Sequence, residues 1–119
     1  LAAVAGKAGG GGMLMIAWTT VATRAEAERL ASGAVTAGLA ACVQIEGPVR
    51  SIYRWEGKLE SAEEYRLSFK CLPGQLPALE KQVLATHAYG TPQWIAVEAA
   101  AVGEKYLSWA RANAHLPTL

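Results

Sequence analysis

The chain has 119 residues, of which 18% are charged and 52% apolar, and its formal net charge is +1. This length supports one domain with one core, and the near-neutral charge excludes the basic surface that nucleic-acid binding requires. The longest apolar run, Met13 to Trp18, is far shorter than the ~20 residues of a membrane-spanning helix, and the high apolar share favours an oligomer.

Residues 1–12 are almost all alanine and glycine, without an apolar period. We predict a flexible leader there, and because the first residue is not methionine, the leader is interpreted as the remnant of a processed extension. The expected domain covers residues 13–115, and residues 116–119 form a tail. The two cysteines, Cys42 and Cys71, form no C-x-x-C pair, which fits a reducing compartment. We therefore expect a cytoplasmic protein, with an organelle stroma or matrix as the location if the leader is a processed extension.

The domain begins with a predicted strand and a predicted helix. Residues 13–20 are mostly apolar and do not alternate, which is typical of a strand inside a sheet. Thr23 and Glu26 form a T-x-x-E capping box that predicts the start of a helix. Gly38 suits the left-handed backbone conformation at the end of that helix.

Residues 40–71 predict two long strands folded back on each other, with the turn near Gly57. Gly47 and Pro48 predict a bulge or bend, because proline cannot donate to the ladder. From residue 61 onward the alternation is clean, with an apolar face and a solvent-facing one that carries Glu64 and Lys70. Arms of about a dozen residues reach roughly 40 Å at ~3.3 Å per residue, further than a domain of this size. We expect the arms to overhang their own domain and contact another copy.

The remaining chain predicts a helix, a loop, a strand and a short closing helix. The helix spans about residues 76–86 and keeps polar side chains, Gln75 among them, on its outer side. The loop covers residues 87–92, the strand begins at Trp94, and Gly103 opens the closing helix, from which Trp109 can dock on the body of the domain. The element order is β-α-β-β-α-β. With right-handed crossovers this order gives an α+β fold of the split βαβ type, a four-stranded antiparallel sheet with both helices on one face.

Several segments of the chain are distinctive: LAACV at 39–43, SIYRWEGK at 51–58, Glu64, Lys70, the loop 87–92 and YLSW at 106–109. In this order, and over residues 13–113, the chain resembles the CutA family of divalent-cation tolerance proteins. The resemblance implies a ferredoxin-like subunit with a long hairpin in a tight homotrimer, similar in plan to the PII signalling proteins.

The resemblance also implies a site for Cu²⁺ or another divalent cation at the imidazole of His87, with possible help from the thiolate of Cys42, and no organic cofactor. The family loop usually runs His-Pro-Tyr-Glu-(Val/Thr)-Pro-Glu, whereas this chain has Gly90 and Gln93 at the two acidic positions. Their loss removes negative charge that helps to hold a dication. On ordinary structural grounds Cys42 is a small buried apolar residue and His87 caps a helix.

The resemblance further implies a cleft between subunits, in which a lysine could hold an anion, lined by Tyr53, Trp55, Glu64, Lys70 and Tyr89. Read without the family, Glu64 and Lys70 are two solvated charges six residues apart, whose ion pairs carry little energy. Tyr53 and Trp55, with Trp109, are then packing anchors at a contact between copies.

No nucleophile with a paired base and no phosphate-binding loop is found, so the sequence does not support an enzyme. The leading interpretation is a non-enzymatic homotrimer linked to divalent metal (copper) tolerance that binds metal ions weakly, without nucleic-acid or membrane partners. Two alternatives stay open. One is a PII-like sensor of a small anionic molecule in the intersubunit cleft, and the other is a scaffold for a partner protein.

Overall fold

The computed structural model describes residues 13–114, so the predicted leader at 1–12 and the predicted tail at 116–119 lie outside the described residues. Within this range the elements follow in the predicted order, with one 3-10 turn, Pro73–Gln75, before the second long helix. They are β1 (Met15–Val21), α2 (Arg24–Thr36), β2 (Cys42–Trp55), β3 (Lys58–Cys71), α3 (Leu76–Ala85), β4 (Ile95–Glu98) and α4 (Glu104–Ala112).

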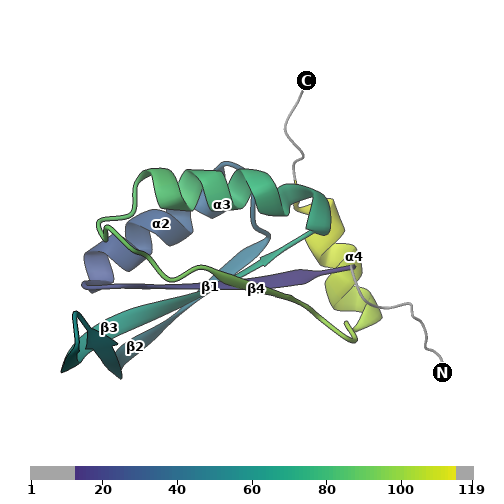
Figure 1. Ribbon diagram of the computed structural model, residues 1–119. Coiled ribbons are helices and arrows are strands. Elements are labelled where there is room, and N and C mark those ends of the chain that lie inside the picture. The colour runs from purple at the N-terminus through teal and green to yellow at the C-terminus, as the bar shows by residue number, and fades with distance from the viewer. Residues whose placement is uncertain (1–12, 115–119) are drawn as a thin grey trace.

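The four strands form one antiparallel sheet in the order β2-β3-β1-β4. Helices α2 and α3 lie together on one face of this sheet, and α4 lies at one end of it (Figure 1). The predicted α+β, ferredoxin-like βαββαβ fold is therefore confirmed. None of the helices in the described range combines the length and the apolar character that crossing a membrane needs.

Helix α2 begins and ends at the residues that the sequence indicates. Thr23 is the N-cap, and its Oγ1 accepts a hydrogen bond from the Glu26 amide at 3.2 Å. Gly38 has φ 73°, and Leu39 N donates to Ala34 O at 2.9 Å, which closes the helix as a Schellman motif. Only half of the predicted capping box forms, because the Glu26 carboxylate binds the loop after α3 instead.

The core fills the space between the sheet and the two long helices. Its largest fully buried apolar side chains are Val21, Leu67, Phe69, Cys71, Leu79 and Val83. The ring of Phe69 lies 5.8 Å from that of Trp94, which follows the loop. A smaller cluster of Leu14, Leu107 and Ala110 holds α4 against the end of the sheet.

One polar residue is buried where the sequence suggested exposure. Gln75 is fully buried, so its prediction as an outward-facing residue is wrong. Its side-chain amide donates to Gly38 O, and its Oε1 accepts from Leu72 N at 2.8 Å. The side chain thus satisfies the backbone at the end of α2 and before α3, which is why burying it is tolerated.

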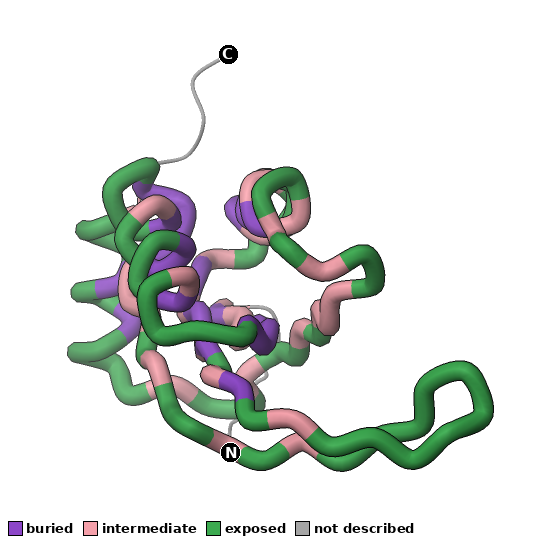
Figure 2. Tube along the Cα trace, turned by 90° about the vertical axis from the view of Figure 1, so that its left-hand side faces the viewer, coloured by how far each residue is buried: buried purple, intermediate pink, exposed green. Residues whose placement is uncertain are grey.

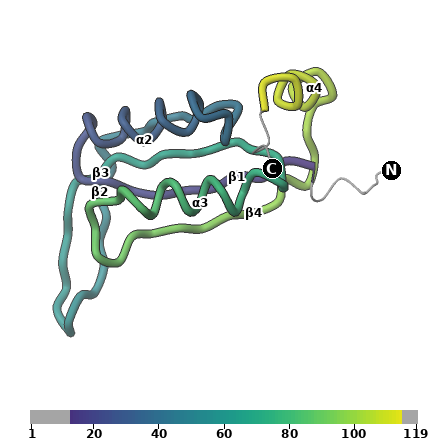
Figure 3. The backbone as a smooth tube through the Cα atoms, turned by 90° about the horizontal axis from the view of Figure 1, so that it is seen from above, coloured from purple at the N-terminus to yellow at the C-terminus, as the bar shows by residue number. Residues whose placement is uncertain are grey.

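Strands β2 and β3 form a hairpin of 14 residues per arm that leaves the body of the domain (Figures 2 and 3). Trp55 pairs with Lys58, so the turn is Glu56–Gly57, with φ 49° and 78°. The register shifts between Glu46 and Val49, which confirms the predicted bulge at Gly47 and Pro48. The predicted overhang is confirmed, and residues 52–61 at its tip are all exposed (Figure 2).

Candidate functional site

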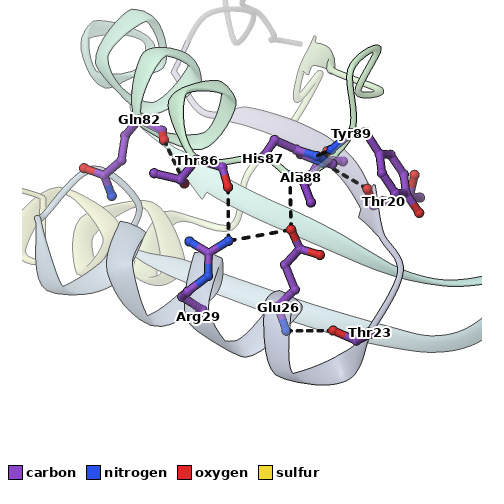
Figure 4. A network of polar contacts seen from close by, with 10 residues as sticks. Thr20, Thr23, Glu26, Arg29, Gln82, Thr86, His87, Ala88 and Tyr89 are labelled. Atoms are coloured by element: carbon purple, nitrogen blue, oxygen red, sulfur yellow. Dashed lines mark hydrogen bonds and ion pairs between the residues drawn. The ribbon is translucent and has the colours of Figure 1, made fainter.

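The loop after α3 folds onto the end of β1 through the imidazole of His87 (Figure 4). His87 Nε2 lies 3.0 Å from Thr20 O and 3.1 Å from Thr19 Oγ1. Thr19 Oγ1 itself donates to Gln93 O at 2.7 Å. Because the Thr20 carbonyl can only accept, Nε2 carries the proton and donates toward β1.

The second ring nitrogen of His87 is engaged as well. Nδ1 lies 3.1 Å from the Tyr89 amide nitrogen and accepts its hydrogen, and the two rings are 5.0 Å apart. The network thus assigns a neutral imidazole with the proton on Nε2. A metal ion needs a nitrogen lone pair, and the only lone pair lies on Nδ1, so a metal there must displace the Tyr89 N–H.

Tyr89 joins the loop to a buried carboxylate on β3. Glu64 is only 8% exposed, and its two carboxylate oxygens accept from Ser51 Oγ at 2.6 Å and from the Tyr89 hydroxyl at 2.7 Å. Burial first, and then the Glu64 carboxylate, raise the pKa of Tyr89 far above its ordinary value, so the phenol keeps its proton. The prediction that Glu64 is a solvated charge is wrong, because the loop and β2 supply hydroxyl groups that replace water.

Cys42 and His87 do not meet within the subunit. Cys42 pairs with Lys70, which pairs with Ile16 near the start of β1, whereas His87 binds Thr20 at the other end. Cys42 is level with Ile16 and His87 with Thr20, four residues further along β1, so the two side chains are separated by about 13 Å along the strand. In the part of the chain that the structure describes, no three His, Cys, Asp or Glu side chains lie close enough to hold a metal ion. Residues 13–114 of one chain therefore offer single donor groups and not a complete metal centre.

The predicted cleft residues lie partly together and partly apart. Glu64 and Tyr89 are in contact, and Tyr53 lies near enough to Tyr89 to add to the rise of its pKa. Lys70 lies six residues further along β3, roughly 20 Å from Glu64. The Lys70 ammonium donates to the side-chain oxygen of Gln44. Trp55 lies at the hairpin tip, similarly far from Glu64 in the other direction.

The three predicted interface residues expose large aromatic surfaces in the subunit. Tyr53 and Trp55 are exposed on the hairpin, and Trp109 is exposed on α4, where its ring lies 5.5 Å from that of Tyr106. Ser51, which holds Glu64, and Thr19 and Thr20, which hold His87, were not predicted as site residues. Ser51 lies in the segment 51–58 that carries the family resemblance, whereas no local signal marks the two threonines of β1.

Comparison with known proteins gives one consistent family. A family model described as CutA1 divalent ion tolerance protein matches residues 15–113. The Arabidopsis thaliana protein "Protein CutA, chloroplastic" is 37% identical over 95 residues, which are 80% of this chain and 52% of that protein. The chain spans about half the length of the plant relatives it matches.

Solved structures give the same result. The structure of CutA from Synechococcus elongatus PCC7942 is 40% identical with a TM-score of 0.81, over 84% of this chain and 88% of that chain. The periplasmic divalent cation tolerance protein CutA from Archaeoglobus fulgidus is 31% identical with a TM-score of 0.81, over 84% of this chain and 97% of that chain.

These names correct one prediction. We expected a cytoplasmic location, but the Arabidopsis relative is named chloroplastic and the Archaeoglobus protein is described as periplasmic. Relatives of this chain are thus named for compartments other than the cytoplasm, and the prediction of a cytoplasmic location is wrong.

Proposed function

Because the chain belongs to the CutA1 divalent ion tolerance family, we propose that it is a non-enzymatic homotrimer that contributes to divalent metal tolerance and binds copper or a similar cation weakly. The observation that carries this proposal is the overhanging hairpin. Its tip exposes Ile52 by 66%, Leu59 by 75% and Trp55 by 49% of their surfaces. A cluster of large exposed apolar side chains is unfavourable in water and marks a surface that another protein surface covers.

The partner proposed for the hairpin is another copy of this chain. The sheet face opposite α2 and α3 carries no helix (Figure 1), and the arms reach beyond the body that they belong to (Figure 3). A hairpin of one copy can therefore cover the sheet of another without any change of fold. Three copies in a ring would give each hairpin a partner and leave no copy uncovered.

Sedimentation of the parent chain tests the assembly. We expect three times the 12.5 kDa subunit mass, and Leu59→Ser should shift the mass distribution toward smaller species at low concentration. Val35→Ser is the matched control, because Val35 is an exposed apolar residue that belongs to α2 and not to the hairpin tip. A well-folded parent protein that sediments as a single subunit at micromolar concentration would contradict the proposal.

Weak metal binding is proposed at His87. The imidazole is half-buried, and its Nδ1 lone pair already accepts the Tyr89 N–H. An ion bound there gains one nitrogen ligand but breaks a hydrogen bond, and the neutral loop residues Gly90 and Gln93 add no charge. Both effects lower the affinity of His87 for a divalent ion, which fits a protein that binds such ions only when their concentration is high.

A Cu²⁺ titration followed by the imidazole signals of His87 tests the metal proposal. A His115→Ala background removes the other histidine of the chain, and Cys42→Ser shows whether the distant thiol contributes. We expect perturbation of the His87 signals at micromolar to millimolar Cu²⁺, lost in His87→Ala and kept in Cys42→Ser. Equal Cu²⁺ binding by the parent and His87→Ala would contradict it.

A PII-like sensor of small anions is the second candidate, favoured by the state of Lys70. Its ammonium contacts the neutral Gln44 amide, and neither ion pair found among residues 13–114 involves it. A lysine without a carboxylate partner can hold an anion at a contact between copies. Phosphate and citrate should then raise the melting temperature of the parent and of the control Lys58→Gln, but not of Lys70→Gln. Equal ligand-induced shifts in all three proteins would exclude this role.

A further inference from the structure

Two charged side chains of α2 bind the backbone of the loop that carries His87 (Figure 4). Arg29 Nη2 donates to Thr86 O at 3.1 Å, and Ala88 N donates to Glu26 Oε2 at 3.2 Å. The same two side chains lie 3.6 Å from each other. We call Glu26 and Arg29 together the α2 clamp.

The two backbone contacts flank His87 on both sides. Thr86 is the C-cap of α3, so its carbonyl lies where a helix leaves acceptors without intrahelical partners, and Arg29 satisfies it. Ala88 supplies an N–H donor that a proline at this position would lack. With residues 86 and 88 both held, the peptide units on either side of the imidazole have fixed positions.

The Glu26 carboxylate binds the loop at Ala88 and not the start of its own helix. Its capping-box pattern would turn the carboxylate back to Thr23 N, but the carboxylate extends across to the loop, and only Thr23 Oγ1 makes its capping bond. The side chain of Glu26 is 14% exposed and that of Arg29 is 52% exposed. Of the two side chains of the α2 clamp, the more buried one is thus Glu26, whose carboxylate accepts the hydrogen bond from Ala88 N.

We propose that Glu26 and Arg29 are positioning residues that keep the His87 loop closed on β1. In the closed loop the Tyr89 N–H covers His87 Nδ1, and the Tyr89 hydroxyl reaches Glu64. Both contacts depend on the path of the chain through residues 86–88. The clamp acts on His87 and Glu64 through that path, without touching either side chain.

The ion pair alone does not account for this role, because a pair with one member half-exposed contributes little. The role belongs to the two backbone hydrogen bonds, and the substitutions can separate the two effects. Glu26→Gln keeps an oxygen that accepts from Ala88 N but loses the charge. Glu26→Ala loses both. Glu28→Ala is the matched control, since Glu28 is an exposed glutamate of the same helix.

Amide hydrogen exchange and imidazole NMR on the full chain without metal test the clamp. In Glu26→Ala we expect the amides of Ala88 and Tyr89 to exchange about tenfold faster, as loss of one well-formed hydrogen bond allows. The core amides of Leu67 and Phe69 should keep their rates. The His87 signals should change from a single Nε2-protonated form to an average of both tautomers, and Glu26→Gln should restore the parent behaviour.

Three results would overturn the proposal. The first is parent-like exchange at Ala88 and Tyr89 in both Glu26→Ala and Arg29→Ala. The second is the same acceleration in Glu28→Ala. The third is a uniform acceleration that includes Leu67 and Phe69, since this reports lost global stability and not a released loop.

One consequence rests on the proposed function. Opening the loop uncovers His87 Nδ1, so Glu26→Ala should bind Cu²⁺ several-fold more tightly than the parent, and Glu28→Ala should not. The two proposals fail separately. If the exchange and tautomer changes occur while His87→Ala binds Cu²⁺ as tightly as the parent, the clamp stands and metal binding at His87 is refuted.

Discussion

The contact between Tyr89 and Glu64 is the part of the site whose energy can be stated most directly. Tyr89→Phe removes the hydroxyl that donates to the buried Glu64 carboxylate at 2.7 Å and leaves Ser51 as the remaining donor. A hydrogen bond to a charged group contributes about 1.5–3 kcal/mol, and because Tyr89 is only half-buried we expect about 1–2 kcal/mol. The ring itself stays, so packing is conserved and the change reports the hydrogen bond.

A double-mutant cycle of Tyr89→Phe and Glu64→Ala, measured by urea unfolding, isolates this contact. The protein concentration must be held constant, because self-association would add to the apparent stability. We expect Tyr89→Phe to cost less in the Glu64→Ala background, with a coupling free energy of about 1 kcal/mol. Tyr65→Phe, on β3, is the control, since the Tyr65 hydroxyl takes no part in the contacts of Glu64, and it should change stability by less than about 0.5 kcal/mol. A coupling free energy below about 0.3 kcal/mol would refute the reasoning.

Two further predictions concern the core and the bulge. Burial raises the pKa of the Cys71 thiol from 9.0 to about 11. Between these pH values the folded state keeps a proton that the unfolded state loses. The contribution to stability, about 2–3 kcal/mol, is therefore fully present below pH 9 and is lost as the pH rises through 11. Thermal unfolding across this range should show a shallower loss in Cys71→Val, and equal slopes would contradict the assignment. In Gly47→Ala the new Cβ would lie 2.4 Å from Cδ2 of Tyr65, so we expect a loss of about 1–3 kcal/mol by chemical denaturation. Gly90→Ala has open space around the new Cβ and should change stability by less than about 0.5 kcal/mol; an equal effect of both substitutions would show that the Tyr65 contact is not the cause.

The fold was predictable because its boundaries depend on a few neighbouring residues. Gly38, the Gly47-Pro48 pair and Gly57 each impose a backbone conformation that ends a helix, interrupts a ladder or reverses a strand. Thr23 accepts from an amide three residues away. Such features need no knowledge of the rest of the chain, and the length of the two arms followed from counting residues between them.

Polar side chains were less predictable because their partners are distant in the sequence. Alternation assigns Glu64 to a side of β3, but it does not say what covers that side, and here a tyrosine from a loop 25 residues later does. Gln75 lies at the polar start of a helix, yet the carbonyl that its amide binds is 37 residues earlier. Glu26 belongs to a capping-box pattern, but its carboxylate accepts a hydrogen bond from an amide 62 residues away and not from Thr23 N. In all three cases the tertiary contact overrides the local preference.

The same limit explains why the predicted site residues form no single site in one subunit. Lys70, Glu64 and Trp55 follow one another along the hairpin at intervals of roughly 20 Å, so no rotation of side chains can bring them together. Only a second chain lying beside the first, shifted along the strand direction, can place a tip residue of one copy near a base residue of another. The length of the arms and the separation of the polar groups therefore both favour the proposed contact between copies. A hairpin shorter by half would fit its own domain and could reach no cleft on a neighbouring copy.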